Sequence, residues 1–210
     1  MNNSEFYKWF DTISSKLEVR QNSFYQIFKY LDKMPDPIII VETGCLRIKN
    51  NYSDGQSTLL FDNYTQFRGK GSKIYTVDID ANATKVCAEN VSKNVSITTG
   101  DSVKYLNNLS KEFIENNTNV SLFYLDSFDC DWKSPEQSAQ HHLKELVSIK
   151  KILKKDTLVV VDDSPIIGYL QQSKVKKDTL ELIKPGIVPG PTISGKGGLV
   201  HEYAVHTGAK

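Results

Sequence analysis

Polar groups that could bind a ligand follow each of five short apolar runs along the chain. In chain order they are Glu42-Thr43-Gly44, Asp78-Ile79-Asp80, Gly100-Asp101-Ser102, Asp126-Ser127-Phe128-Asp129 and Asp162-Asp163-Ser164. A carboxylate can accept hydrogen bonds from two hydroxyl groups at once, and a glycine lets the backbone come close to a ligand. Turn formation alone would explain any one of these groups. Because such a group follows all five apolar runs, we expect the groups to form a ligand-binding site.

The elements that must position these residues alternate between strand and helix. Runs rich in β-branched residues predict strands at 38–41, 73–77, 95–98, 120–125 and 157–161. Helical patterns lie between them at about 56–68, 82–92, 101–116 and 135–153. This alternation predicts an α/β fold with a doubly wound, mostly parallel sheet. Ligands bind outside the carboxyl ends of the strands in such sheets, which is where the polar groups lie.

The two ends of the chain add elements to this core. Apolar residues at three- and four-residue steps predict two amphipathic helices within 6–17 and 24–31, before the first strand. The run 199–205 is interpreted as a last strand. We therefore expect one domain over 1–210, made of a helical cap at 1–34, a cofactor-binding core at 37–164 and an acceptor-side extension at 165–210.

The composition is that of an ordinary globular protein. A formal net charge of +1 without a basic cluster gives no support for a nucleic-acid partner. No stretch is long and apolar enough to predict a membrane span, and Glu5 and Lys8 stand where a signal peptide would be apolar. Three cysteines without a Cys-x-x-Cys pair indicate reduced thiols, so we expect a cytoplasmic protein. The aromatic first helix leaves a homo-oligomer open.

From about 38 to 164 the sequence resembles the class I S-adenosylmethionine-dependent methyltransferases. The resemblance implies the fold of that family, a Rossmann-like sheet, and S-adenosylmethionine as the cofactor. It places Glu42 and Gly44 beside the methionine part of the cofactor. It also implies that Asp78 takes the two ribose hydroxyls and that Asp101 lies near the adenine.

The first loop departs from the family pattern, in which further glycines follow at two-residue spacing. Here a polar insert comes first, and Gly55 and Ser57 are expected at the N-terminus of the next helix. Free backbone N–H groups at that position could hold the carboxylate of the cofactor. Asp126, after the fourth strand, is assigned to the cofactor side as well.

A second group of residues predicts a metal site. Asp126, Asp162 and Asp163 end two strands that are neighbours in this fold, and converging carboxylates repel one another unless a proton or a cation is shared. The arrangement resembles the metal-dependent O-methyltransferases of the catechol type and of the macrolide- and aminocoumarin-sugar type. That resemblance implies that the three aspartates hold Mg²⁺ or another divalent cation, which would bind hydroxyls of the acceptor. Asp129 is the expected base, with Asp131 as its competitor, and Asp129 and Asp126 are the expected catalytic residues.

The sequence thus predicts a divalent-metal-assisted O-methyltransferase that acts on a hydroxyl of a small molecule, such as a sugar or a natural-product-like glycoside. Three alternatives stay open. A different metal-dependent reaction, such as hydroxylation, lacks its two-His-one-carboxylate signature, and an NAD-dependent oxidoreductase lacks Gly-x-Gly-x-x-Gly after the first strand. A non-catalytic S-adenosylmethionine-binding protein would not be expected to retain the acidic groups.

Two further features have competing interpretations. His141 and His142 point about 100° apart on the predicted helix, so they cannot face one metal, and we interpret them as a surface pair. Lys196 stands between glycines in Gly195-Lys196-Gly197-Gly198. It is either a mobile lid residue over the acceptor or part of a glycine-rich turn into the last strand.

Overall fold

A computed structural model describes residues 4–52, 56–131, 133–165 and 193–208. The chain forms two compact units. Unit 1 comprises Met1–Ser127 and Ser148–Val160, and unit 2 comprises Phe128–Val147 and Val161–Lys210. The expectation of one domain over the whole chain stays a prediction.

The sheet has five strands in the order β3-β2-β1-β4-β5. Their bounds are Ile39–Thr43 for β1, Lys73–Asp78 for β2, Val95–Thr99 for β3, Leu122–Leu125 for β4 and Leu158–Val161 for β5. Strand β1 pairs in parallel with both β2 and β4, and β2 pairs in parallel with β3. The chain therefore moves outward from β1 to β3 and then continues on the other side of β1. This confirms the predicted α/β fold and puts the reversal of strand order beside β1.

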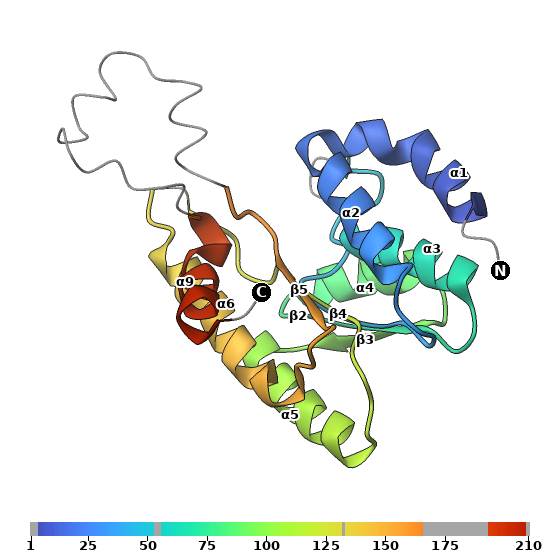
Figure 1. The fold of residues 1–210 in the computed structure, drawn as a ribbon. Coiled ribbons are helices and arrows are strands. Elements are labelled where there is room, and N and C mark those ends of the chain that lie inside the picture. Colours follow the sequence, from blue (N-terminus) through green and yellow to red (C-terminus); the bar gives the residue numbers. More distant parts are fainter. Residues whose placement is uncertain (1–3, 53–55, 132, 166–192, 209–210) are drawn as a thin grey trace. The chain divides into compact units, whose positions relative to one another are not determined.

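The helices that precede β5 occupy the predicted positions to within a few residues. In unit 1 they are α1 (Ser4–Ile13), the 3-10 helix η1 (Ser14–Arg20), α2 (Gln21–Leu31), α3 (Ser57–Arg68), α4 (Ala81–Asn90), α5 (Ser102–Glu115) and the 3-10 helix η3 (Lys150–Ile152). Unit 2 contains α6 (Glu136–Ile149, whose last residues belong to unit 1), the 3-10 helix η4 (Gly195–Gly197) and α9 (Gly198–Thr207). Helices α1 to α3 lie on one side of the sheet and α5 on the other (Figure 1). Within the described ranges, a helix long and apolar enough to cross a membrane is not found.

Aromatic packing fixes the N-terminal helices to the sheet layer of unit 1. The Phe6 ring of α1 lies 4.7 Å from that of Phe28 and 5.1 Å from that of Tyr64, both measured between centroids. Tyr64 belongs to α3, so α1, α2 and α3 share one core. The Tyr7 and Tyr64 hydroxyls donate to the two carboxylate oxygens of Asp32, at 2.6 and 3.1 Å. The aromatic face of the first helix is therefore used within unit 1.

The predicted last strand at 199–205 is wrong, because these residues form helix α9. The run contains β-branched and aromatic residues, which favour a strand, but it does not alternate between apolar and polar positions. Gly198 is the first residue of the helix, and Gly208 ends it in the left-handed conformation, at φ +69°. Glycine in that conformation is a usual helix terminator, and it is the signal that identifies α9 in the sequence.

The turn after β1 brings the backbones of three strands together. Gly44 N–H donates to the Val77 carbonyl of β2 at 2.8 Å, and Asp126 N–H donates to the Thr43 carbonyl at 2.9 Å. Gly44 has φ +80°, and a Cβ atom added to it would lie 2.6 Å from the Asp126 carbonyl oxygen. Glycine is therefore required here by both conformation and space.

We expect Gly44→Ala to destabilise the protein more than Gly71→Ala does. Gly71 has nearly the same φ, +79°, but no atom within 4 Å of an added Cβ, so it isolates the conformational cost. That cost is about 1 kcal/mol, and the steric clash at Gly44 adds about 1–3 kcal/mol. Thermal unfolding should show Gly44→Ala melting about 3–10 °C below Gly71→Ala. Equal melting temperatures would contradict the close approach.

Candidate functional site

A fully buried carboxylate lies near the end of β1. Glu42 Oε2 accepts hydrogen bonds from Thr58 Oγ1 at 2.7 Å and from Thr76 Oγ1 at 3.0 Å. Thr58 belongs to α3 and Thr76 to β2, and Thr58 Oγ1 also accepts from the Leu46 N–H at 3.0 Å. Glu42 therefore joins β1, β2, α3 and the first loop. Thr58 and Thr76 were not anticipated from the sequence: Thr76 lies inside β2, and Thr58 is the second residue of α3, after the Ser57 that was singled out.

The second oxygen of this carboxylate has no partner in the part of the chain that the structure describes. Glu42 Oε1 is buried and makes no hydrogen bond there. Burial raises the pKa of Glu42 to about 7, and the nearby negative charge of Asp126 also acts to raise it. The hydroxyl groups of Ser57, Thr58 and Thr76 act in the opposite direction. A buried acceptor in this state would be stabilised by a donor, above all by a cationic one.

Asp78 connects the end of β2 to the loop after β1. Its Oδ2 accepts from the Cys45 N–H at 3.1 Å, and its Oδ1 accepts from the Asp80 N–H at 2.9 Å. The structure therefore brings Glu42, Gly44 and Asp78 to one edge, as the sequence predicts. A carboxylate has about four acceptor positions, so these two bonds leave capacity for ligand hydroxyls.

The thiol next to this carboxylate is not suited to nucleophilic chemistry. The hydrogen bond between Cys45 and Cys87 and the burial of Cys45 raise the pKa of the Cys45 thiol well above its usual range. The thiolate is the reactive form, so Cys45 stays protonated and inert at neutral pH.

The loop between β1 and α3 is held by a glutamine that the sequence did not single out. Gln56 is buried, has φ +61°, and its Nε2 donates to the Ile48 carbonyl at 2.6 Å. Its Oε1 accepts from the Asn50 N–H at 3.1 Å. Ser57 is the first residue of α3, as predicted. Gly55 lies outside the described residues.

Asp101 has a structural role in this protein. It is exposed, and its Oδ1 accepts from the Lys104 N–H at 2.8 Å as the N-cap of α5. Asp80 caps α4 in the same way through the Asn82 N–H. A capping aspartate satisfies free helix N–H groups, so this geometry needs no ligand. The position of Asp101 near an adenine stays a prediction.

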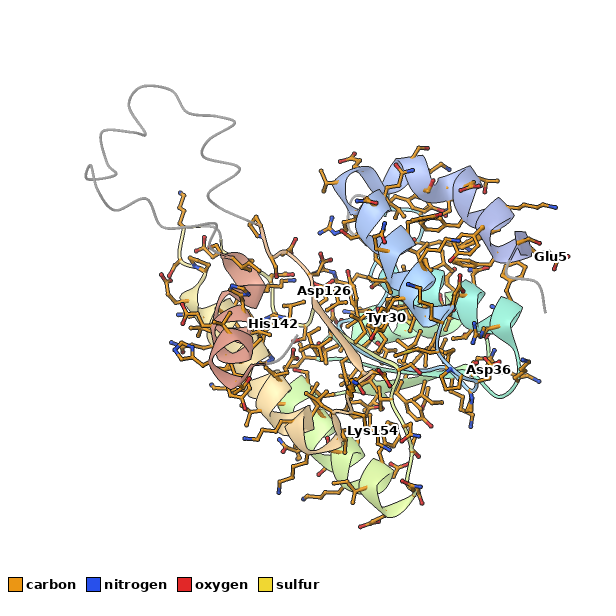
Figure 2. All side chains as sticks on the ribbon, viewed as in Figure 1. Glu5, Tyr30, Asp36, Asp126, His142 and Lys154 are labelled. Carbon is orange, nitrogen blue, oxygen red and sulfur yellow. The ribbon has the colours of Figure 1, made fainter. Side chains whose placement is uncertain are left out.

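The aspartates predicted to hold a metal are divided between the two units. Asp126 follows β4 in unit 1, and Figure 2 shows it at the opposite end of the strands from Asp36. Asp162 and Asp163 belong to unit 2, as does Asp129, which is exposed. Among the residues described, no group of three or more His, Cys, Asp or Glu side chains is arranged to hold a metal ion. The three-aspartate metal site therefore stays a prediction.

The acidic turn after β5 contacts Lys196 within unit 2. Asp163 has φ +45°, and its N–H donates to Asp162 Oδ1 at 2.8 Å. Lys196 Nζ lies 3.2 Å from Asp163 Oδ2, and the Lys196 side chain is 2% exposed. Lys196 is therefore buried against the turn rather than exposed as a lid. Of the two interpretations of Lys196, the glycine-rich turn agrees with the structure, but the turn leads into helix α9 rather than into the predicted strand.

The interpretation of the two histidines as a surface pair is wrong for His142. His142 is completely buried in unit 2, and its Nδ1 lies 2.8 Å from the Ser138 carbonyl oxygen. That oxygen only accepts, so Nδ1 carries the proton. Burial lowers the pKa of His142, which keeps the ring neutral near pH 7. The polar residues Ser138, His142 and Glu145 share the buried side of α6, which concealed that side in the hydrophobic pattern.

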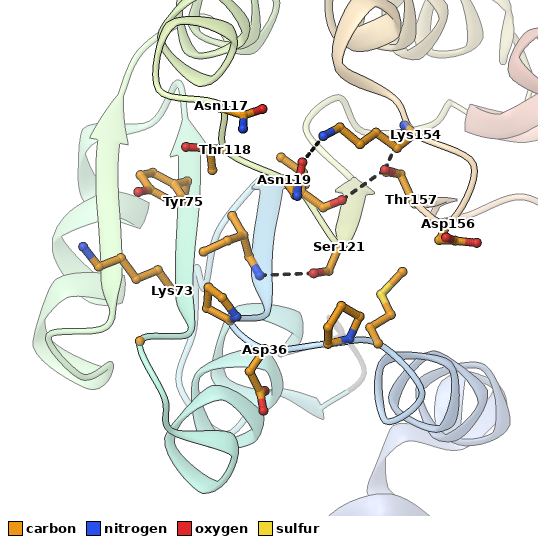
Figure 3. A pocket seen from close by; sticks show the side chains of 16 residues that line it. Asp36, Lys73, Tyr75, Asn117, Thr118, Asn119, Ser121, Lys154, Asp156 and Thr157 are labelled. Atoms are coloured by element: carbon orange, nitrogen blue, oxygen red, sulfur yellow. Dashed lines mark hydrogen bonds between the residues drawn. The ribbon is translucent and has the colours of Figure 1, made fainter.

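A pocket of about 540 Å³ lies at the other edge of the sheet, where the strands begin (Figure 3). Its polar side chains satisfy the strand ends: Ser121 Oγ accepts from the Ile39 N–H at 3.3 Å, and Thr157 Oγ1 donates to the Val120 carbonyl at 3.0 Å. Lys154 donates to Asn119 on its rim. This pocket is remote from Glu42, which lies toward the far end of β1.

Comparisons with known proteins give no family for this chain. No family model matches it, and no curated protein matches it. Among solved structures, it is similar to a short chain dehydrogenase family protein from Francisella tularensis subsp. tularensis SCHU S4, at 15% identity over 83% of this chain and 78% of that chain, with a TM-score of 0.42. A likeness at this level carries no argument about activity.

We expect the buried Glu42 to make stability depend on pH. Its pKa of about 7 lies above the ordinary value of 4.5, so between these pH values the unfolded chain releases a proton that the folded protein keeps. The free energy of unfolding should therefore fall as pH rises through this window, by up to about 3 kcal/mol. Glu42→Gln removes this contribution. Urea unfolding at pH 5 and pH 8 measures it, and an identical pH dependence in both proteins would refute the raised pKa.

Proposed function

We propose that this protein is an S-adenosylmethionine-dependent methyltransferase that acts on a hydroxyl group of a small molecule. One observation carries the proposal. Three residues meet where strand order reverses: Glu42, a buried carboxylate with one oxygen that lacks a partner among the described residues; Gly44, where a side chain would clash; and Asp78, which accepts from the Cys45 N–H. Ligands of doubly wound sheets bind at that position.

The residues at this edge fit the chemical groups of the cofactor. The unpartnered Oε1 of Glu42 would accept from the cationic amino group of the methionine part. The absent side chain of Gly44 would let the backbone approach it closely, and the remaining acceptor positions of Asp78 would take the ribose hydroxyls. The first N–H groups of α3, which begins at Ser57, would face the cofactor carboxylate.

When bound, S-adenosylmethionine would supply an electrophilic methyl group. The chain must then position the acceptor oxygen in line and remove its proton, and Asp129 is the proposed base. Asp129 is exposed on the loop that follows β4, where a mobile acceptor could reach it. Asp126 borders the cofactor side, since its charge acts on Glu42.

The residues predicted to hold a divalent metal have competing contacts in this structure. Asp126, Asp162 and Asp163 supply the oxygen ligands that Mg²⁺ prefers. However, Asp163 Oδ2 already contacts the Lys196 ammonium, and Asp162 Oδ1 accepts from a backbone N–H. These two residues, as arranged in unit 2, do not fit a metal unless Lys196 moves. The proposed reaction therefore uses no step through a metal.

Three other functions remain as alternatives. An NAD-dependent oxidoreductase would also use an acidic residue after β2, but it is disfavoured by the missing Gly-x-Gly-x-x-Gly after β1. A non-catalytic S-adenosylmethionine-binding protein would share the cofactor site and differ only in lacking turnover. A hydroxylase-like metal reaction would need the metal that Asp163 does not readily accommodate.

We expect S-adenosylhomocysteine to bind the wild-type protein and NAD not to bind. Isothermal titration calorimetry with Asp78→Ala should show affinity reduced by at least about tenfold, because two ribose hydroxyls lose a shared acceptor worth about 1.5–3 kcal/mol. Asp80→Ser is the matched control, because it lies two residues away and keeps a capping side chain for α4. Binding of NAD alone would favour the oxidoreductase, and equal losses in both variants would remove Asp78 from the site.

The affinity for S-adenosylhomocysteine should rise with pH between 6 and 8. Its amino group stays cationic in this range, and binding it favours the ionised form of Glu42, whose pKa is about 7. Below that pKa, binding must release a proton, so the dissociation constant should approach a tenfold change per pH unit. Glu42→Gln should bind more weakly and without this dependence. A wild-type affinity that does not vary with pH would show that Glu42 does not contact the amino group.

A further inference from the structure

We infer that Lys196 is a cation supplied by the chain itself, and that it balances the charge of the acidic turn Asp162-Asp163, two of the three residues predicted to hold a divalent metal. This inference goes beyond the proposed function and does not depend on it, because it concerns contacts within unit 2 alone. It rests on three observations: a buried ion pair, backbone hydrogen bonds that hold Lys196 beside the turn, and two glycines at which a side chain would clash with the turn.

The ion pair is held at both its side chain and its backbone. Lys196 Nζ lies 3.2 Å from Asp163 Oδ2, and the Lys196 N–H donates to the Asp163 carbonyl, also at 3.2 Å. The Ser194 N–H donates to the Pro165 carbonyl at 3.0 Å. The segment before α9 therefore runs beside the acidic turn and is bonded to it on either side of Gly195. The Lys196 ammonium can move away from Asp163 in two ways only: this backbone pairing breaks, or the lysine side chain rotates by itself.

The two glycines around Lys196 explain why the sequence reads Gly-Lys-Gly. Gly195 has φ +68°, and a Cβ atom on it would lie 2.1 Å from the Asp163 carbonyl oxygen. A Cβ atom on Gly197 would lie 2.3 Å from Ser164 Oγ. Any other residue at either position would push the segment away from the turn. The glycines thus bring the lysine to the acidic turn rather than providing a flexible hinge.

The surroundings show that the lysine charge is needed. A buried ammonium is costly unless it is paired, and Lys196 is 2% exposed while Asp163 is 28% exposed. The charges of Asp163 and Lys196 act in opposite directions on the Cys130 thiol, so the two groups face the same region. The buried His142 also feels the Lys196 charge, together with that of Glu145.

A consequence follows for metal binding. Asp163 is one of the residues predicted to hold the divalent ion, so the ion would compete with the Lys196 ammonium for this carboxylate. At a separation of a few ångströms the two cations would also repel each other. Wild-type protein should therefore bind a divalent ion weakly at this turn, and removal of the lysine charge should create the affinity.

A double-mutant cycle with Mn²⁺ as the probe tests this inference on the full chain. We expect Lys196→Met to lower the melting temperature by about 5–10 °C, because it removes the buried ammonium that contacts Asp163 Oδ2. Asp163→Asn tolerates the left-handed backbone, and in the double variant it should recover part of that loss. Mn²⁺ should raise the melting temperature of Lys196→Met only, with affinity measured by electron paramagnetic resonance about tenfold above that of the wild type.

The pair Lys70 and Asp36 provides the matched control. Lys70 Nζ lies 2.8 Å from Asp36 Oδ2, but Lys70 is 61% exposed. The same cycle there, Lys70→Met with Asp36→Asn, should give little coupling and no Mn²⁺ response. Coupling at Lys196 and Asp163 without any Mn²⁺ binding would still support charge balance by the lysine. Losses that simply add, or wild-type Mn²⁺ binding as tight as that of Lys196→Met, would overturn the inference.

Discussion

The Glu42 carboxylate is the interaction on which the candidate site depends. It is removed from water at the end of the central strand, and through Thr58 and Thr76 it joins β1, α3 and β2. Leu46 of the first loop is bound to the same Thr58 hydroxyl. Burying a carboxylate without hydrogen bonds costs free energy, so a donor to its second, unpartnered oxygen would stabilise the folded protein. We interpret this as preorganisation: the fold holds the acceptor in place before the ligand arrives.

The backbone around this carboxylate is equally constrained. Gly44 touches the Asp126 carbonyl and bonds to β2, while Asp78 holds the following N–H group. The turn after β1 thus has contacts on the sides of both neighbouring strands, because β1 lies between β2 and β4. The aromatic core of α1, α2 and α3 supports this edge from one side of the sheet. Strands β1 and β2 and the turn after β1 therefore position Glu42, Gly44 and Asp78, the three residues on which the proposed cofactor site rests.

The sheet and the polar residues at the ends of its strands could be predicted from the sequence because both follow from local patterns. Buried parallel strands are continuous apolar runs, and residues such as Glu42 and Asp78 stand directly at their ends. Longer-range relations could not be predicted in this way. The burial of His142 on a polar side of α6 and the pairing of Lys196 with Asp163 both depend on which segments meet in space. Helix α9 was not predicted because its β-branched and aromatic residues favour a strand, while the signal for a helix lies only in the glycines at its two ends.

The two parts of the candidate site differ in their free binding capacity. Glu42 keeps an oxygen without a partner in the described part of the chain, whereas the acidic turn that contains Asp163 is already in contact with the Lys196 ammonium within unit 2. The most direct test of the account is an electron-density map of crystals grown with S-adenosylhomocysteine. We predict ligand density with its amino group at Glu42 Oε1 and its ribose at Asp78. Density in the pocket lined by Ser121 and Thr157 at the other edge of the sheet, or none at a saturating concentration, would contradict it.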